Sequence, residues 1–160
     1  MFDQFSDRAK RVVFLTRLYA GRRGAPALEP NDLVVALVQE DQGELAKPPF
    51  PGAAVMSGLK PSRPYFSAEA ASEIRLAIER VSAKSKPIPD SEDMQASPAL
   101  SRTFQNALAL REKLGQKQVE PLLLLAGFLS EQPCEACEIL KQAGITREAV
   151  LAAITTGEHS

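Results

Sequence analysis

The sequence predicts an all-α protein made of two similar four-helix units in tandem. A shift of 91 residues places segment 6–46 on segment 97–137 without a gap, and the two share residues at matched helix starts and turns. Apolar residues recur at the three-and-four spacing of amphipathic helices, and no segment alternates convincingly as a strand would. Internal duplication, with a pseudo-two-fold relation between the copies, is therefore the expected architecture.

The identical pairs in this alignment exceed the roughly two or three matches that composition alone would supply over such a length. They are Ser6/Ser97, Arg11/Arg102, Gly24/Gly115, Glu29/Glu120, Pro30/Pro121, Leu33/Leu124, Glu40/Glu131 and Glu44/Glu135. Similar apolar residues occupy positions where a core needs them, such as Leu28/Val119 and Leu37/Phe128. The same helices are therefore expected in both copies.

The first two helices of each copy carry the same start and stop signals. Ser6 and Ser97 are candidate N-caps, because a serine hydroxyl accepts a hydrogen bond from the first turn, and Gly24 and Gly115 end these helices. A Glu-Pro pair then opens a second helix, since proline suits a first turn that does not need its missing N–H. This second helix is nearly all apolar in both copies, which predicts that it is central and surrounded by its neighbours.

The remaining segments differ between the copies. Helices at Glu135–Gln142 and Thr146–Ile154 complete the second unit. In the first, prolines make Lys47–Tyr65 a long, mostly irregular loop before a helix at Ser67–Val81. The polar stretch Ala83–Ala96 is expected to be an extended, solvated linker. The prediction is one domain over residues 1–160, with repeat one at 1–82, modified by the Pro-rich loop 47–65, the linker at 83–96 and repeat two at 97–157.

Composition favours an ordinary globular protein. Of 160 residues, 44% are hydrophobic and 24% are charged, and the net charge is −1. This charge gives no general attraction to nucleic acid or anionic membranes. The longest apolar run is too short to cross a bilayer, and no secretory signal opens the chain. We expect a cytoplasmic location, with no membrane or nucleic acid partner.

The first helix is locally basic: Arg8, Lys10, Arg11, Arg17, Arg22 and Arg23 outnumber Asp3 and Asp7. Such a helix can dock an acidic protein partner, contact nucleic acid, or simply be solvated. A small helical regulator that binds nucleic acid through this helix is the alternative function of another class. The Pro-rich loop carries Phe50, Val55, Met56 and Tyr65, which either pack on their own domain or meet a partner.

No catalytic, metal or nucleotide site is predicted. Gly52–Lys60 lacks the spacing of a phosphate-binding loop. Cys134 and Cys137 supply two thiols where structural zinc needs four ligands, and the single histidine, His159, stands near the end. That lone histidine also disfavours Ser-His or Cys-His catalysis. We expect no enzyme activity and no cofactor; a hydrolase would require a pocket of acids with shifted pKa values.

The residues at matched positions resemble the Clp amino-terminal domain, the tandem four-helix repeat at the front of Clp-type AAA-plus unfoldases. The resemblance spans nearly the whole chain. It rests on a set of matching segments in each repeat, called the first and second frame below, rather than on one diagnostic motif. In the first frame stand Phe5-Ser6-Asp7-Arg8-Ala9, Arg22-Arg23-Gly24, and Leu28 through Leu33-Val34. In the second stand Ser97-Pro98-Ala99-Leu100, Lys113-Leu114-Gly115, Val119, and Leu124-Leu125-Ala126-Gly127-Phe128, then Leu129-Ser130-Glu131-Gln132.

The resemblance implies a non-catalytic module that docks adaptor proteins or protein substrates for the Clp chaperone and protease system. Some family members capture phosphorylated arginine with a Thr-Glu pair, which is replaced here by Pro30-Asn31 and Pro121-Leu122, so this sequence does not support that activity. The expected partner-binding residues are Arg8, Arg11, Arg17, Arg22, Glu29, Asn31 and Glu120. The groove between the repeats and the surface of the first helix are the expected contact regions. Whether the chain acts alone or is part of a larger ATPase stays open, as does its oligomeric state.

Overall fold

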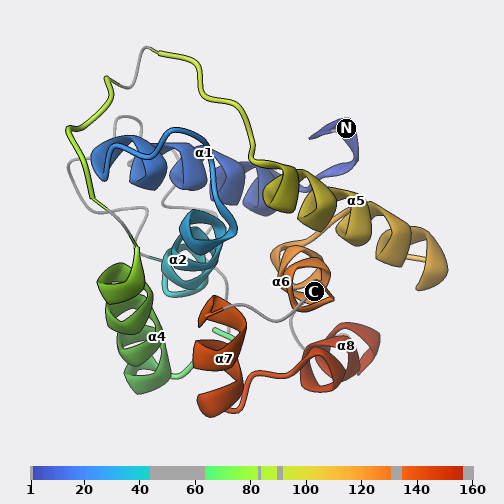
Figure 1. Cartoon of the computed structure of the whole chain (residues 1–160). Helices are drawn as coiled ribbons and strands as arrows, with labels where there is room; N and C mark the ends of the chain where they lie inside the picture. Colours follow the sequence, from blue (N-terminus) through green and yellow to red (C-terminus); the bar gives the residue numbers. More distant parts are fainter. Residues whose placement is uncertain (1, 44–63, 83, 90–91, 131–134, 157–160) are drawn as a thin grey trace.

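The computed structural model describes residues 2–43, 64–82, 84–89, 92–130 and 135–156, and within them the chain is helical (Figure 1). A short 3-10 helix precedes seven α-helices in these ranges, and two isolated bridges are the only strand-like pairings there. The elements are η1 (Phe2–Gln4), α1 (Asp7–Arg22), α2 (Pro30–Asp41), α4 (Ala68–Val81), α5 (Pro98–Lys113), α6 (Pro121–Leu129), α7 (Glu135–Gln142) and α8 (Arg147–Thr156). The all-α prediction is confirmed.

The helices α1 and α5 begin and end at positions 91 residues apart, as the alignment predicts. The Ser6 hydroxyl accepts a hydrogen bond from the Ala9 amide, and the Ser97 hydroxyl accepts one from the Leu100 amide, both at 3.1 Å. After each helix a glycine adopts the left-handed conformation, with φ of 71° at Gly24 and 68° at Gly115. The same local chemistry therefore starts and stops both helices.

The helices α2 and α6 form the centre of the fold. Glu29 and Glu120 are their N-cap residues, and Pro30 and Pro121 occupy the first turn. Both helices are buried around most of their circumference, because they lie between α1 and α5 on one side and α4, α7 and α8 on the other (Figure 1). This placement explains why their sequences are apolar on all faces.

Packing between helices follows the same scheme in both halves. Helix α1 packs on α2 as α5 packs on α6, and α2 contacts α4 as α6 contacts α8. Across the halves, α1 contacts α6 and α2 contacts α5. Gly127 permits the close approach of α6 to α5, because a Cβ there would lie 2.7 Å from the Thr103 carbonyl oxygen.

Two backbone bridges join the halves, and the 91-residue shift exchanges them. Val119 accepts a hydrogen bond from the Ser6 amide at 3.0 Å and donates to the Gln4 carbonyl at 2.8 Å. Leu28 likewise accepts from the Ser97 amide and donates to the Gln95 carbonyl, both at 2.8 Å. Reciprocal contacts of this kind are the pattern of a two-fold relation. The two bridges are consistent with the predicted two-fold relation between the repeats, and that relation stays a prediction.

The described parts of the linker 83–96 lie along α1, where we expected an extended and solvated spacer. The Ser85 amide donates to the Arg23 carbonyl at 2.7 Å, and the Ile88 amide donates to the Gly21 carbonyl at 2.8 Å. The backbone fits this closely because Gly21 and Gly24 have no Cβ: one on Gly24 would lie 2.3 Å from the Lys86 carbonyl oxygen.

Most of the predicted loop 47–65 lies outside the described residues. Its end is tied to α2, since the Asp41 carboxylate accepts hydrogen bonds from the Tyr65 and Phe66 amides at 2.7 and 2.9 Å. Among the described residues, no helix is both long and apolar enough to span a membrane.

Candidate interaction site

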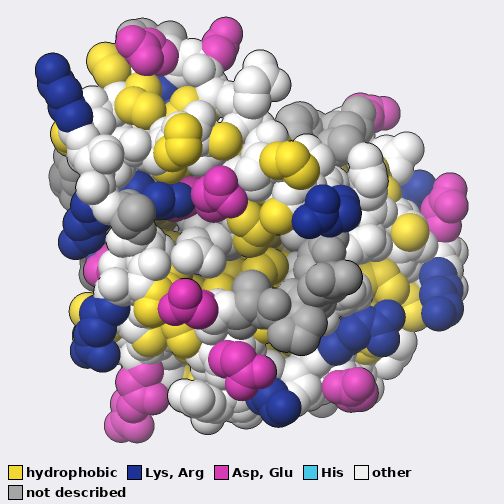
Figure 2. Space-filling view, viewed as in Figure 1, with side chains coloured by type: hydrophobic (Ala, Val, Ile, Leu, Met, Phe, Trp, Pro, Cys, Tyr) yellow, Lys and Arg dark blue, Asp and Glu magenta, His cyan; other side chains and the backbone are white. Residues whose placement is uncertain are grey.

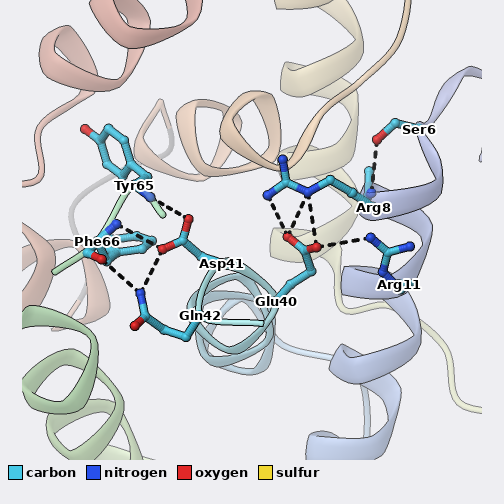
Figure 3. A network of polar contacts seen from close by, with 9 residues as sticks. Ser6, Arg8, Arg11, Glu40, Asp41, Gln42, Tyr65 and Phe66 are labelled. Carbon is cyan, nitrogen blue, oxygen red and sulfur yellow. Dashed lines mark hydrogen bonds and ion pairs between the residues drawn. The ribbon is translucent and has the colours of Figure 1, made fainter. Parts of the chain in front are cut away.

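The basic residues of α1 do not form one docking surface. Arg8 and Arg11 turn toward Glu40 of α2, which is 1% exposed (Figure 3). The Arg8 Nη2 lies 2.9 Å from Glu40 Oε1, and the Arg11 Nη2 lies 3.2 Å from Glu40 Oε2. Arg11 is only 4% exposed, so its expected place on a partner-binding face is wrong: the charge is satisfied inside the fold.

Arg17 acts on the linker. Its Nη2 donates to the Pro89 carbonyl at 2.7 Å, and its Nε donates to the Glu92 carbonyl at 3.2 Å. The guanidinium therefore holds the linker against α1. Its role in this structure is a contact within the chain.

The two N-cap glutamates, Glu29 and Glu120, have different neighbours. The Glu29 amide donates to the Asp32 carboxylate at 3.1 Å, so this residue belongs to the polar start of α2. Glu120 makes no side-chain cap bond to α6, and its charge helps to raise the pKa of Arg8, as does that of Glu40, although burial alone would lower it. Glu120 therefore lies near the Arg8–Glu40 pair, at the end of α2, whereas Glu29 stands at the start of that helix.

A cleft opens where the ends of α1 and α4 meet the start of α2. It has a volume of about 410 Å³. Two of the predicted residues, Arg22 and Asn31, line it. The full lining is Tyr19, Arg22, Arg23, Asn31, Asp32, Val35, Glu79, Ser82, Lys84 and Ser85, and this set is called the polar cleft below.

The wall of the polar cleft is an ion pair between α1 and α2. The Arg23 Nε donates to Asp32 Oδ1 at 2.7 Å, and its Nη2 donates to Oδ2 at 2.9 Å. This bidentate hydrogen bond raises the pKa of Arg23 above its usual value, against the effect of burial. Both Asp32 oxygens are thereby occupied, and the carboxylate is 3% exposed. The pair is a rigid, electrically neutral wall.

A second set of polar contacts fixes the opposite wall. The Asn31 Nδ2 donates to the Ser82 hydroxyl at 3.2 Å, and that hydroxyl donates to the Ile78 carbonyl at 2.7 Å. The chain of contacts joins α2 to the end of α4. An asparagine amide has two N–H donors and one carbonyl acceptor, so Asn31 keeps further hydrogen-bonding capacity for a ligand.

The charges that face solvent in the polar cleft are mainly cationic. Arg22 and Lys84 are exposed, while Glu79 lies beside Arg75 with an Nε to Oε1 distance of 3.5 Å. Figure 2 shows that basic and acidic side chains are otherwise interspersed over the face in view, with no extended patch of one sign.

The expected groove between the repeats is much smaller. A cavity of about 20 Å³ lies between α2 and α6, with Arg8, Asp41, Phe66 and Leu122 in its lining. Such a volume holds about one water molecule and no side chain. In this conformation the polar cleft is the larger of the two cavities.

The polar cleft is also lined by Tyr19, Asp32, Ser82 and Lys84, which are not among the predicted site residues. A signal was present in the alignment: the residues 91 positions after Tyr19, Arg23, Asn31 and Asp32 are all leucines. The junction between the first two helices is thus polar in the first repeat and apolar in the second. The fold that the repeats share does not require this difference.

No group of three or more His, Cys, Asp or Glu residues suited to a metal ion occurs in the described part of the chain. Cys137 lies half-buried in α7, and Cys134 and His159 lie outside the described residues.

Comparisons with known proteins agree with this fold. Residues 66–143 match the family model of the Clp repeat (R) N-terminal domain. The N-terminal domain of the caseinolytic protease associated chaperone ClpD from Arabidopsis thaliana superposes with a TM-score of 0.66 at 20% identity, covering 98% of both chains. A comparison with curated proteins returned no match.

Two further solved structures share the fold. One, described as part of a malarial protein secretion system, has a TM-score of 0.71 at 18% identity, covering 98% of this chain and 95% of its own. The Hsp104 N-terminal domain from Candida albicans has a TM-score of 0.62 at 13% identity, covering 93% and 87%. The family match at residues 66–143 and the fold shared with the ClpD and Hsp104 N-terminal domains confirm the resemblance to the Clp amino-terminal domain that the sequence predicts.

Proposed function

We propose that this chain is a non-enzymatic protein-interaction module that docks adaptor proteins or protein substrates for a Clp-type chaperone or protease. The observation that carries the proposal is the polar cleft of about 410 Å³ on a fold of the Clp N-terminal class. Its walls are set by the Arg23–Asp32 ion pair and by hydrogen bonds that join α2 to the end of α4, so the cleft is formed before a partner arrives. A preformed site loses less entropy on binding than a flexible one.

The basic first helix supports the alternative, nucleic acid binding, less well. Arg8 and Arg11 pair with Glu40, and Arg17 donates to linker carbonyls. Phosphate binding needs cations that reach the surface together. Because these three guanidiniums are engaged within the fold, the helix offers far fewer such cations than its sequence indicates.

The predicted cytoplasmic location stays a prediction.

Photo-crosslinking inside the native host tests the proposal. A photoreactive amino acid replaces Ser85, which is exposed at the rim of the polar cleft, and as a matched control it replaces Lys117, which is exposed on the other half. We expect the Ser85 probe to capture a Clp-type ATPase, an adaptor or a substrate protein, identified by mass spectrometry. Capture of nucleic acid alone, or of no protein from either position, would overturn the proposal.

A further inference from the structure

The walls of the polar cleft are fixed in different ways. The Arg23–Asp32 pair joins α1 to α2 through a bidentate hydrogen bond at a buried carboxylate. Hydrogen bonds also join α2 to the end of α4. Both sets of contacts connect helices of the folded core. The remaining wall is formed by Lys84 and Ser85, which belong to the linker and to no helix.

The linker wall is held by hydrogen bonds rather than by burial. No side chain of the segment 84–89 is buried. The Ser85 and Ile88 amides donate to the Arg23 and Gly21 carbonyls at 2.7 and 2.8 Å. Segments with few buried apolar contacts and exposed hydrogen bonds open locally at a small cost in free energy. The linker is therefore the wall of the cleft that can move.

Arg17 fastens the linker to α1 from outside the cleft. Its Nη2 donates to the Pro89 carbonyl at 2.7 Å, and its Nε donates to the Glu92 carbonyl at 3.2 Å. The Arg17 side chain does not line the cleft. Because Pro89 follows Ser85 by only a few residues, the guanidinium acts on the cleft through the linker.

Gly21 makes room for this contact. A Cβ on Gly21 would clash with Arg17 Nη1 and would lie 3.2 Å from the Ile88 carbonyl oxygen. Gly21 lies within α1 and does not have a positive φ, so the helix itself gives no reason for a glycine there. The missing side chain lets the guanidinium and the linker lie close to the helix. Arg17 and Gly21 together are called the latch below.

The second repeat shows the same helix end without a latch. The residues 91 positions after Arg17 and Gly21 are Leu108 and Glu112. The C-cap backbone is nearly identical, with φ of −89° after α1 and −92° after α5 and ψ of 0° in both. A Cβ on Gly115 would have no atom within 4 Å, so no described segment packs over the end of α5. The latch residues thus occur at the helix end that the linker crosses.

We infer that the linker is a movable wall of the polar cleft and that Arg17, with Gly21, is the positioning residue that holds this wall closed. The inference rests on the proposed function, because the cleft is the same, and it adds how the shape of the cleft is set. With the latch formed, Lys84 and Ser85 keep fixed positions at the cleft. A partner that binds the closed cleft and the latch contacts then stabilise each other by the same free energy.

Hydrogen exchange measured by NMR on the full chain tests the latch directly. In Arg17→Leu, which introduces the residue of the second repeat, the Ser85 and Ile88 amides are expected to exchange about tenfold faster, because loss of the guanidinium hydrogen bonds makes local opening easier. Arg17→Lys keeps a cationic donor and is expected to give an intermediate rate. Unchanged exchange at Ser85 and Ile88 in Arg17→Leu would overturn the inference.

Gly21→Ala separates the latch from general stability. Alanine is favoured over glycine within a helix, so the temperature of thermal unfolding is expected to stay the same or rise. The Ser85 and Ile88 amides are nevertheless expected to exchange faster, because the added methyl group displaces the guanidinium. In an Arg17→Leu background the same change is expected to add little. Full additivity of the two changes would contradict a shared latch.

The signals of Asn31 and Val35, which line the cleft on α2, report on the linker wall. We expect their amide chemical shifts to change in Arg17→Leu. The matched control signals are those of Leu122 and Ala126, at the positions 91 residues later, and these are expected to stay unchanged. Faster linker exchange with unchanged Asn31 and Val35 signals would show that the linker does not shape the cleft, and would overturn the inference.

Crosslinking from Ser85 in the native host distinguishes this inference from the proposed function. The yield of captured protein is expected to fall severalfold in Arg17→Leu. An equal yield with and without Arg17 would leave the proposed function standing and overturn the positioning role. Capture of no protein, together with faster exchange and shifted Asn31 signals, would overturn the proposed function and leave the latch standing.

Discussion

Arg8 and Glu40 form a three-point contact between α1 and α2. The Arg8 Nε lies 3.2 and 3.1 Å from the two Glu40 oxygens, and its Nη2 lies 2.9 Å from Oε1 (Figure 3). Arg11 adds a fourth contact to the same carboxylate. One buried carboxylate therefore compensates two arginines that come from successive turns of the neighbouring helix.

Replacing Glu40 with alanine is expected to lower the free energy of unfolding by about 3–5 kcal/mol, because two partly or fully buried cations lose their counter-charge. Urea denaturation measures the change. The control is Glu79→Ala, which removes the exposed pair with Arg75 and is expected to cost less than about 1 kcal/mol. Equal losses in the two variants would contradict the role of Glu40.

The double variant Arg23→Leu with Asp32→Leu introduces the residues that the second repeat has at these positions, Leu114 and Leu123. We expect a free energy of unfolding that is unchanged or increased by about 1–4 kcal/mol, since well-packed apolar residues can replace a buried ion pair. Asp32→Leu alone is expected to be destabilising, because Arg23 then lacks its partner. Thermal unfolding separates these outcomes. A strongly destabilised double variant would show that the junction of α1 and α2 needs its ion pair.

Asp41 is expected to titrate above its ordinary range. Burial raises its pKa above 3.8, and the Tyr65 and Phe66 amides oppose this only in part. The folded state then binds the proton more readily than the unfolded state, so stability falls as pH rises from 3.8 to the folded pKa and is level above it. Asp41→Asn should lose this slope, which urea denaturation at a series of pH values measures; parallel curves for the two proteins would refute the shift.

Gly127→Ala is expected to destabilise the fold by about 1–3 kcal/mol, because the added methyl group would meet the Thr103 carbonyl and the Ala107 amide of α5. The matched position of α2 holds Ala36, where the reverse change, Ala36→Gly, is expected to cost about 1 kcal/mol through helix propensity. Chemical denaturation of both variants tests whether the two helix crossings differ in this way. A stabilised Gly127→Ala variant would show that α5 and α6 can separate freely.

Ser6→Ala and Ser97→Ala are each expected to cost about 1 kcal/mol, since each hydroxyl caps a helix at the same 3.1 Å distance. Equal losses are the expected result of equivalent positions in two copies. The double variant should show the sum of the single losses if the caps act independently. A loss at one cap and none at the other would argue against equivalence.

Local chemistry made the helices predictable. Serine caps, glycine stops and proline at the first turn act within a few residues, so α1 and α5 begin and end, and α2 and α6 begin, where the sequence signals stand. The same signals stand at matched positions in both copies. The Pro-rich loop lacks such signals, and most of it lies outside the described residues.

The candidate site was predictable only in part. Arg22 and Asn31 were selected and do line the polar cleft, whereas Arg11 was selected for its charge and is buried. A charged residue on a helix is usually solvated, and nothing within α1 reveals that Glu40 lies opposite on another helix. Lys84 was not selected because only the path of the linker along α1 brings it to Arg22.

The order of residues determined by itself the helix class, the four matched helix starts and the family resemblance, because caps, turns and apolar periodicity are local or repeating features. Tertiary packing decided which arginines are inside, where the linker lies, and that residues from α1, α2 and α4 enclose one cavity. These outcomes depend on contacts between segments tens of residues apart, and such contacts leave no periodic trace along the chain.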